Sequence, residues 1–388
     1  MVVIKGVDAK PILDSRKEKT IEVLIKTDIG IFKASSPSGK STGKYEMKTY
    51  KKNLEGDIKT LKKFTDYFLG EILDSFDDLK HVEDVLDGHV GANTIFAFES
   101  AVLKAIASEQ KKEIWELINP SAKKFPRLVG NCVGGGKHSE EIKNKKPDFQ
   151  EFEIIADKKS VKENYKENKK TKKEIGEILK EVDKNFSGKK NDENAWRVSL
   201  NEKEVLDVLK KVNIPVGLDI AASSFYSRKK YKYENPMLKR DSEEQFSYVV
   251  NLIKNYNLIY VEDPFDEEDF ESHAKLLKKF PESLIVGDDL IVTNSMRLKK
   301  AIEMKAVNAI IVKPNQCGSL LEVKRVCELA KNNGIKLVFS HRSGETTETI
   351  LADLAFGFGT DFFKCGIEGD VRVKKIERLI EIEKKLKK

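Results

Sequence analysis

Two periodicities of apolar residues alternate through the second half of the chain. Short apolar runs, typical of buried strands, are separated by longer stretches in which apolar residues recur at helical spacing. The strand-like runs are residues 215–218, 258–261, 284–286, 309–312, 336–339 and 361–364. Strands that alternate with helices in this way indicate a parallel sheet, and this many consecutive units favours a closed (β/α)8 TIM-type barrel, an α/β fold.

Helix-start signals follow several of these runs. Ser319 stands three residues before Glu322, which is the capping-box pattern, and Ser242 stands in the same relation to Gln245. We therefore expect helices to begin at these two serines. Further helices are expected to begin near residue 267, at Asn294 and after the last strand-like run.

The first part of the chain has a different pattern. Strand-like runs are followed by two stretches with helical spacing, which indicates a separate α+β unit. The strand-like runs are residues 2–4, 21–27 and 31–34, and the helical stretches are 54–80 and 93–118. Strand-like runs resume at 128–133 and 149–155. We expect an N-terminal α+β capping domain at residues 1–124 and a barrel domain at residues 125–388.

Positive charge is concentrated in one segment. The 388-residue chain has a formal net charge of +7, and residues 158–190 hold twelve Lys against six acidic residues. The rest of the chain is therefore almost neutral, which argues against a general nucleic-acid surface. Apolar residues in the segment keep a helical stripe, and only Tyr165 and Phe186 interrupt the charge, so a solvated helix is expected rather than a base-stacking surface.

Cysteine usage and hydropathy indicate an intracellular compartment. The four Cys lie far apart without a CxxC pair, so neither a disulfide framework nor a zinc knuckle is expected. No run approaches the roughly 18 apolar residues of a membrane span, and the N-terminal residues lack the apolar core of a signal peptide. We expect a cytoplasmic protein that makes no membrane contact.

A charged or polar side chain follows each strand-like run of the second half. These residues are Asp219, Glu262, Asp288, Lys313, His341 and Lys364. In a parallel barrel the carboxyl ends of the strands meet at one rim, where the active site is built. A single acid at a strand end is often only a helix cap, but six such residues in register predict a functional site.

The three carboxylates predict a divalent cation. Oxygen ligands suit a hard ion such as Mg²⁺, which keeps its remaining positions for water and substrate. Lys313, across from the cation, is expected to have a lowered pKa and to act as a base. A base beside a bound metal ion can remove a proton α to a carboxylate, while the ion stabilises the resulting ene-diolate.

Ten short motifs match one known family. They are residues 12–16, 36–43, 91–93, 150–152, 219–223, 262–265, 287–290, 292–294, 313–316 and 340–346. With these motifs the chain resembles enolase (phosphopyruvate hydratase) over most of its length, and the last motif, Ser-His-Arg-Ser-Gly-Glu-Thr, is highly specific to that family. The resemblance implies the dehydration of 2-phosphoglycerate to phosphoenolpyruvate.

The resemblance also implies a role for each matching residue. Asp219, Glu262 and Asp288 would bind one Mg²⁺, and Ser41 would reach a second Mg²⁺ that is recruited with the substrate. Lys313 would take the C2 proton, and Glu193, with Glu151 beside it, would protonate the departing hydroxyl. Gln150, Arg342, Ser343 and Lys364 would bind the substrate carboxylate and phosphate, while His138 on the catalytic side and His341 on the substrate side would line the site. The implied partner is a small phosphorylated hydroxy acid, and family analogy implies a homo-oligomer, either a dimer or an octamer.

The loops around the expected site depart from the family's pattern. Residues 191–196 have lost the family's flexible glycines and gained Trp196, and residues 133–139 and 367–372 also differ. Lys40 stands where a small residue is usual. Two alternatives therefore remain open: an enolase-superfamily paralogue with the same proton abstraction on another carboxylate, and a non-catalytic binding protein.

Overall fold

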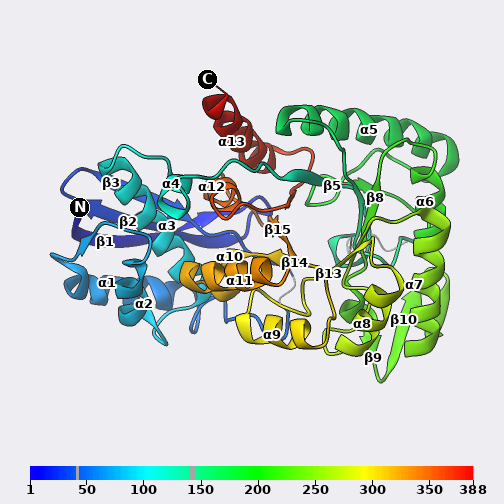
Figure 1. Cartoon of the computed structure of the whole chain (residues 1–388), viewed down its shortest axis with the longest axis horizontal. Coiled ribbons are helices and arrows are strands. Elements are labelled where there is room, and N and C mark those ends of the chain that lie inside the picture. The colour runs from blue at the N-terminus through cyan, green and yellow to red at the C-terminus, as the bar shows by residue number, and fades with distance from the viewer. Residues whose placement is uncertain (41–42, 140–144, 388) are drawn as a thin grey trace.

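An antiparallel sheet and its helices form the N-terminal part of the molecule. The computed structural model describes residues 1–40, 43–139 and 145–387. The sheet has the order β3-β2-β1-β4, and Figure 1 shows it beside the barrel. Its strands are β1 (Val2–Leu13), β2 (Lys19–Thr27), β3 (Ile31–Ser35) and β4 (Ile72–Leu73). Buried and more exposed residues roughly alternate along β2, as expected for a sheet with one covered face.

The N-terminal helices are shorter than the apolar pattern predicted. They are α1 (Leu54–Phe68), α2 (Leu79–Leu86), α3 (Ala92–Glu109) and α4 (Ile114–Ile118). The predicted helix 54–80 is interrupted by Gly70, whose φ of +84° lies in the left-handed region, and by strand β4. Almost every residue of α3 is buried, because α3 packs on β2 and β3 on one side and meets the barrel helix α10 (Pro314–Cys317) on another.

Eight strands in the described part of the chain close into a barrel, as predicted. Their order is β16-β15-β14-β13-β12-β8-β6-β5, and a parallel pairing between β16 and β5 closes the ring. The strands are β5 (Arg127–Gly134), β6 (Glu151–Ile154), β8 (Val216–Asp219), β12 (Tyr260–Glu262), β13 (Leu284–Gly287), β14 (Ala309–Val312), β15 (Lys336–Ser340) and β16 (Phe362–Lys364). All neighbours are parallel except β6, which runs antiparallel to both β5 and β8.

Helices cover the outside of the barrel. They are α5 (Val161–Val182), α6 (Glu202–Leu209), α7 (Ser242–Tyr256), α8 (Phe270–Lys279), α9 (Ser295–Glu303), α10, α11 (Leu320–Asn332), α12 (Ile350–Gly357) and α13 (Asp370–Leu386). The Lys-rich segment forms α5, an amphipathic helix with its apolar residues Ile175 and Leu179 fully buried. No helix among the described residues has the length and apolar character that a bilayer crossing requires.

Two predicted helix caps have different partners in the structure. Helix α7 begins at Ser242, but its N-cap is one residue earlier than expected, at Asp241, and Glu244 completes the capping box. Ser319 caps α11 by accepting from the Glu322 amide, but the Glu322 carboxylate accepts from the Ser295 amide instead of returning to Ser319. The same side chain therefore ties α11 to the start of α9.

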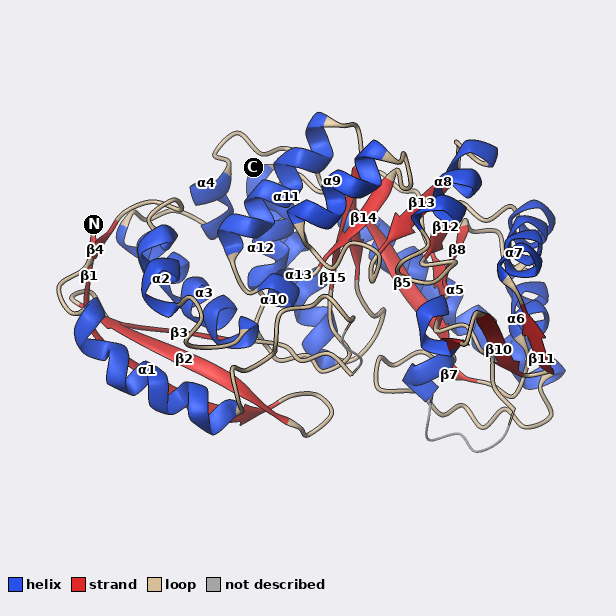
Figure 2. Cartoon of the chain, turned by 90° about the horizontal axis from the view of Figure 1, so that it is seen from below, coloured by secondary structure: helices blue, strands red, loops and turns tan. Residues whose placement is uncertain are grey.

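A small hairpin sheet lies at the far end of the barrel and had no counterpart in the predicted elements. Its strands are β9 (Tyr226–Ser227), β10 (Lys230–Glu234) and β11 (Met237–Arg240), in the order β11-β10-β9, and Figure 2 shows them apart from the barrel strands. A further short strand, β7 (Trp196–Arg197), pairs with the end of β5. That pairing attaches the loop before β7 to the barrel rim.

The N-terminal part and the barrel share one apolar core. A single cluster of buried side chains extends from Ile4 in β1 through Phe98 in α3 to Leu320 in α11 and Leu379 in α13. A smaller cluster fills the barrel interior with residues such as Ile311. Because the largest core crosses between the two parts, their relative position is fixed by packing.

Candidate active site

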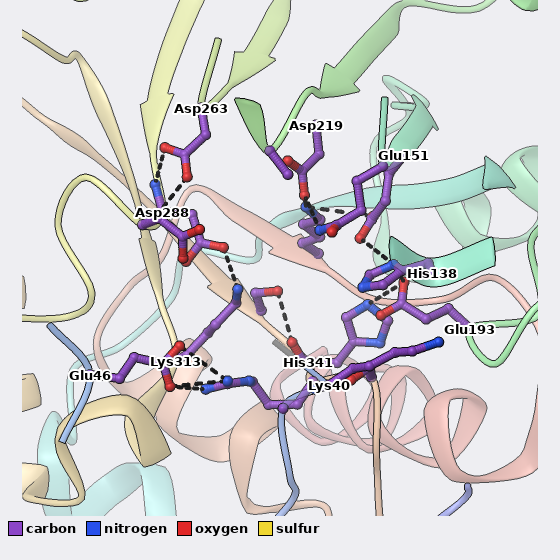
Figure 3. Close-up of a pocket in the computed structure, with 18 residues that line it drawn as sticks. Lys40, Glu46, His138, Glu151, Glu193, Asp219, Asp263, Asp288, Lys313 and His341 are labelled. Carbon is purple, nitrogen blue, oxygen red and sulfur yellow. Dashed lines mark hydrogen bonds and ion pairs between the residues drawn. The ribbon is translucent and has the colours of Figure 1, made fainter. Parts of the chain in front are cut away.

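A polar pocket opens at the carboxyl ends of the barrel strands, where the sequence predicted a site. Seven carboxylates and four cationic side chains are among its lining residues. The acids are Glu46, Glu151, Glu193, Asp219, Asp263, Asp288 and Asp289, and the cations are Lys40, Lys313, Arg342 and Lys364. Figure 3 shows Lys313 on one side of the pocket and Glu193, with His138 and His341, on the other.

The three predicted metal ligands come from adjacent strands. Asp219 and Glu262 are the last residues of β8 and β12, and Asp288 directly follows β13. All three are buried. The Lys364 ammonium lies between the first two, with Nζ 3.0 Å from Asp219 Oδ2 and 2.8 Å from Glu262 Oε2. The carboxylate of Asp288 is instead bound by Lys313.

A second group of acids surrounds Asp288, and sequence reasoning missed it. Ligand oxygens of Asp263, Asp288 and Asp289 lie within 4.8 Å of one another. The Asp263 carboxylate accepts from the amides of Asp288 at 2.9 Å and of Asp289 at 2.7 Å, so it fixes the backbone that presents Asp288. The signal was available, because an acid follows both Glu262 and Asp288 in the sequence.

The donor set fits a divalent cation. Burial, and then repulsion from Asp219, raises the pKa of Glu262 well above its usual range. Burial, and then repulsion from Asp288, raises the pKa of Asp289 to about 7. The pocket therefore holds more carboxylates than its ammonium and guanidinium groups neutralise, and hard oxygen donors in this density are the ligands that Mg²⁺ takes.

Lys313 contacts one of the predicted metal ligands directly. Its Nζ donates to Asp288 Oδ2, and its backbone amide donates to Thr293 Oγ1 at 2.9 Å. Burial alone would lower the pKa of Lys313, but the Asp288 carboxylate outweighs burial and raises the pKa above the usual value. The predicted lowering of this pKa refers to a bound cation across from the amine, and it stays a prediction.

The two glutamates on the other side of the pocket have opposite electrostatic environments. Burial, and then the neighbouring Glu193 carboxylate, raises the pKa of Glu151 well above its usual range. Burial would also raise the pKa of Glu193, but His138 and His341 lower it well below. The His138 ring Nδ1 is 3.4 Å from an oxygen of each glutamate. Of this pair, Glu151 is therefore the member that holds a proton more readily.

The predicted substrate-binding residues line the same pocket. The Arg342 guanidinium donates to the Glu46 carboxylate at 3.1 Å, so Glu46 is a pocket acid that the sequence did not single out. The Ser343 hydroxyl accepts from the Lys40 amide at 2.7 Å and from Arg16 Nη1 at 3.2 Å. The structure thus joins Ser343 to the loop that precedes Ser41.

Gln150 and Ser41 complete the set of predicted site residues. The Gln150 side-chain amide donates to Asp219 Oδ2 at 3.3 Å, which places it beside a predicted ligand. Ser41 lies outside the described residues, and its predicted contact with a second Mg²⁺ stays a prediction. Its neighbour Lys40 lines the pocket, and the Lys40 ammonium lies 3.6 Å from Asp192, next to Glu193.

Comparison with known proteins agrees with this geometry. The family model described as "Enolase, C-terminal TIM barrel domain" matches residues 122–388, and the one described as "Enolase, N-terminal domain" matches residues 4–118. The chain belongs to the enolase family. Proteins named enolase from Methanosphaera stadtmanae, Picrophilus torridus and Pyrobaculum aerophilum are 36%, 34% and 33% identical to it. The alignments cover 99%, 99% and 94% of this chain and 97%, 99% and 91% of those relatives.

Two loops that depart from the enolase pattern are packed against each other. The fully buried Lys172 of α5 donates from Nζ to the Asn194 carbonyl, and its Nζ lies 2.9 Å from Glu368 Oε2. Trp196 lies against the same helix, and its Nε1 donates to the Lys172 carbonyl at 2.9 Å. A Cβ on Gly369 would lie 2.3 Å from the Asn194 side chain, so the two loops interlock. The segment that carries Glu193 is therefore held by α5 and by the loop before α13.

Proposed function

We propose that this protein dehydrates 2-phosphoglycerate to phosphoenolpyruvate in the presence of Mg²⁺. The observation that carries the proposal is the placement of a candidate base and a candidate acid across one pocket. Figure 3 shows the Lys313 amine and the Glu151–Glu193 pair on opposite sides of it. Elimination of water needs one group to take a proton and another to protonate the departing hydroxyl, and a substrate between the two sides can contact both.

We assign proton abstraction at C2 to Lys313. Its side chain is only 16% exposed and its ammonium is held by Asp288, so the side chain is fixed before the substrate arrives. Asp219, Glu262 and Asp288 would hold Mg²⁺, which when bound supplies positive charge to the substrate carboxylate. When Asp288 serves as a ligand, its carboxylate would hold the Lys313 proton less strongly, which would lower the pKa of this lysine toward that of a base.

We assign protonation of the hydroxyl at C3 to the pair Glu151 and Glu193. The elevated pKa of Glu151, caused by burial and by Glu193, makes it the proton reservoir of the pair. The depressed pKa of Glu193 follows from His138 and His341 and keeps this carboxylate ionised. One proton shared between them can be delivered to the hydroxyl, and His138, 3.4 Å from both, orients the carboxylates.

The remaining predicted residues supply the anion-binding surface. Arg342 and Ser343 would bind the substrate phosphate, and Lys364 and Gln150 would face its carboxylate. The Glu46 carboxylate occupies the Arg342 guanidinium in this structure, so phosphate binding would have to displace or share that contact. We also propose that Ser41 reaches a second Mg²⁺ that is recruited with the substrate, that the protein acts in the cytoplasm, and that it forms a homo-oligomer.

The test is an assay for enolpyruvate absorbance with 2-phosphoglycerate and Mg²⁺. We expect turnover in the wild type, none after EDTA, and a loss of about 10²- to 10⁴-fold in kcat for Lys313→Ala, the range for removal of a general base. Lys299→Ala, an exposed lysine of α9 outside the pocket, is the matched control and should keep full activity. If the wild type shows no turnover at every temperature tested, the proposal is refuted.

A second candidate keeps the proton abstraction but changes the substrate. Trp196 and Lys40 in the loops near Glu193 favour it, because those loops would contact the end of the substrate that carries the hydroxyl and phosphate. A screen of phosphorylated and unphosphorylated hydroxy acids separates the two candidates. If another acid gives a higher kcat/KM than 2-phosphoglycerate, and Lys313→Ala abolishes both reactions, this second function replaces the first.

A further inference from the structure

Arg372, near the start of α13, is a fully buried cation without a carboxylate partner. Its side chain is 0% exposed, its Nη1 has no hydrogen-bond partner, and none of the ion pairs in the described part of the chain includes it. A buried charge is expensive unless it is paired or hydrogen-bonded. The hydrogen bonds that this guanidinium makes therefore indicate its role.

All the side-chain hydrogen bonds that Arg372 donates go to three consecutive residues of the candidate site. Its Nε donates to His341 Nδ1 at 3.0 Å. Its Nη2 donates to the backbone carbonyls of Arg342 at 3.3 Å and Ser343 at 2.8 Å. One guanidinium thus holds the end of β15 and the segment that would bind the substrate phosphate.

The contact with His341 determines which ring nitrogen carries the proton. A guanidinium can only donate, so Nδ1 of His341 must accept. In the neutral imidazole the proton then resides on Nε2, and Nε2 lies 3.7 Å from Glu193 Oε2. The charged groups that act on this ring are Glu193 from the 191–196 loop, Arg372 and Lys375 from α13, and Lys364 from β16.

The backbone leaves room for this side chain at one glycine. A Cβ on Gly366 would lie 2.4 Å from Cδ of Arg372 and 2.9 Å from the carbonyl oxygen of Glu193. The Arg372 side chain therefore passes through the place where any other residue would put its Cβ. Gly366, Arg372, His341 and Glu193 form one packed unit.

We infer that Arg372 is a positioning residue, which fixes His341 in the Nε2-protonated form and aims that N–H at Glu193. Burial lowers the pKa of His341 well below its usual value, so the ring stays neutral, with its Nε2–H facing Glu193 Oε2 at 3.7 Å. The effect on catalysis rests on the proposed function, in which Glu193 works with Glu151 at the C3 hydroxyl. The tautomer itself does not depend on that function.

The first measurement is the ¹⁵N spectrum of the histidine side chains, with His341 assigned by comparison with His341→Gln. In the wild type we expect Nδ1 of His341 to be the unprotonated nitrogen, from pH 6 to 8. In Arg372→Met we expect a mixture of tautomers and the appearance of the doubly protonated ring within that range. A proton on Nδ1 in the wild type overturns the inference, and this result does not depend on Arg372→Met or on enzymatic activity.

The second measurement is the pH dependence of kcat and KM with 2-phosphoglycerate. Arg372→Met should lower kcat by about 10- to 100-fold, the usual cost of removing a group that orients an imidazole. Arg372→Lys, which keeps one donor, should recover part of that loss. Gly366→Ala, which displaces the side chain, should resemble Arg372→Met.

The matched control is Arg378→Met on the same helix. Arg378 donates to Asp353 at 2.7 Å and lies outside the pocket lining, so its removal should cost stability without changing the histidine spectrum or the pH profile. If both variants change kcat alike and the His341 tautomer is the same in both, Arg372 is only structural and the inference is wrong. If the wild type shows the expected tautomer but no dehydration of 2-phosphoglycerate, the proposed function fails and the tautomer assignment stands.

Discussion

The side chains of the candidate site are held by ion pairs, in which several buried acids share a few buried cations. Lys364 lies within 3.5 Å of oxygens of Glu151, Glu153, Asp219 and Glu262, and it is 2% exposed. Burial would lower the pKa of Lys364, but Asp219 and the neighbouring glutamates raise it well above the usual value. The ammonium therefore stays charged throughout the physiological range and acts as a fixed internal cation.

A different residue, His273 in α8, makes stability depend on pH. It is fully buried beside Phe265, and burial lowers its pKa from 6.5 to about 4. The unfolded chain therefore binds more protons than the folded protein between these values, so stability is lost as the pH falls from 6.5 toward 4. By linkage the loss reaches about 3 kcal/mol at pH 4. Thermal unfolding of His273→Gln and the wild type at pH 7 and pH 4.5 should show a smaller decrease in the variant; equal decreases would contradict the assignment.

At the residue scale the sequence predicted the side chains at strand ends and missed those that reach the pocket from other segments. Asp219, Glu262 and Lys313 were found because strand ends in a parallel barrel converge. Glu46 and Arg372 were missed because they come from a loop of the N-terminal part and from α13, and no local period indicates such a contact. The direct contact between the Lys313 ammonium and Asp288, which raises the pKa of this lysine, was also missed, because strand-end spacing does not show which neighbouring side chains touch.

At the scale of elements, the segment 191–196 is braced by α5 and by the loop before α13. The ammonium of Lys172, the carboxylate of Glu368 and the ring of Trp196 form this brace, and Lys190 adds a second ion pair to Glu368 at 2.5 Å. A Cβ on Gly176 would lie 3.0 Å from the Trp196 ring, so helix and ring are in close contact. The brace holds the backbone on either side of Glu193.

We expect Lys172→Met to loosen this brace. The Asn194 carbonyl would lose its donor, which should lower the free energy of unfolding by about 1–3 kcal/mol. Displacement of Glu193 should lower kcat, and Trp196 should become more accessible to acrylamide, measured by fluorescence in a Trp115→Phe background. Lys173→Met, an exposed neighbour on α5, is the control. Unchanged quenching of Trp196 in Lys172→Met would contradict the role of the brace.

Most elements of the barrel were predictable because their apolar runs are short and regularly spaced. The observed β14 (Ala309–Val312) has the predicted bounds, and β15 and β13 differ by one residue. The hairpin β9–β11 was missed because its residues Tyr226 to Arg240 alternate lysine with tyrosine and carry few aliphatic residues. The helix 54–80 was predicted too long because the apolar spacing continues past Gly70, whereas the backbone turns there.

At the scale of the whole molecule, the shared core makes the two parts depend on each other. Besides the apolar cluster, Lys104 of α3 forms an ion pair with Glu348 at 2.7 Å, and Ser38 forms a β-bridge with Gly344. The boundary at residues 124 and 125 stays a prediction. With this much common core, we expect one cooperative unfolding transition rather than two.

We further expect Mg²⁺ to stabilise the whole molecule. An ion that binds only the folded state at 100 times its Kd adds about 2.7 kcal/mol. Calorimetry should show one transition that moves up by several degrees with MgCl₂ and returns with EDTA, compared with NaCl at equal ionic strength. Asp288→Asn should reduce this shift strongly. An equal shift in that variant would place the ion elsewhere, and two separate transitions would contradict the shared core.

Because β6 runs in the opposite direction, the barrel can also place functional side chains in the pocket from a segment that precedes a strand. In a fully parallel ring, functional groups come only from segments that come after a strand. Here Gln150 and Glu151 come before or at the first residue of β6, yet they reach the same pocket because that strand points the other way. Substitutions in the few residues just before β6 could therefore change the proton-donating side of this site during evolution. The loops that follow the parallel strands, with their metal ligands, would not have to change.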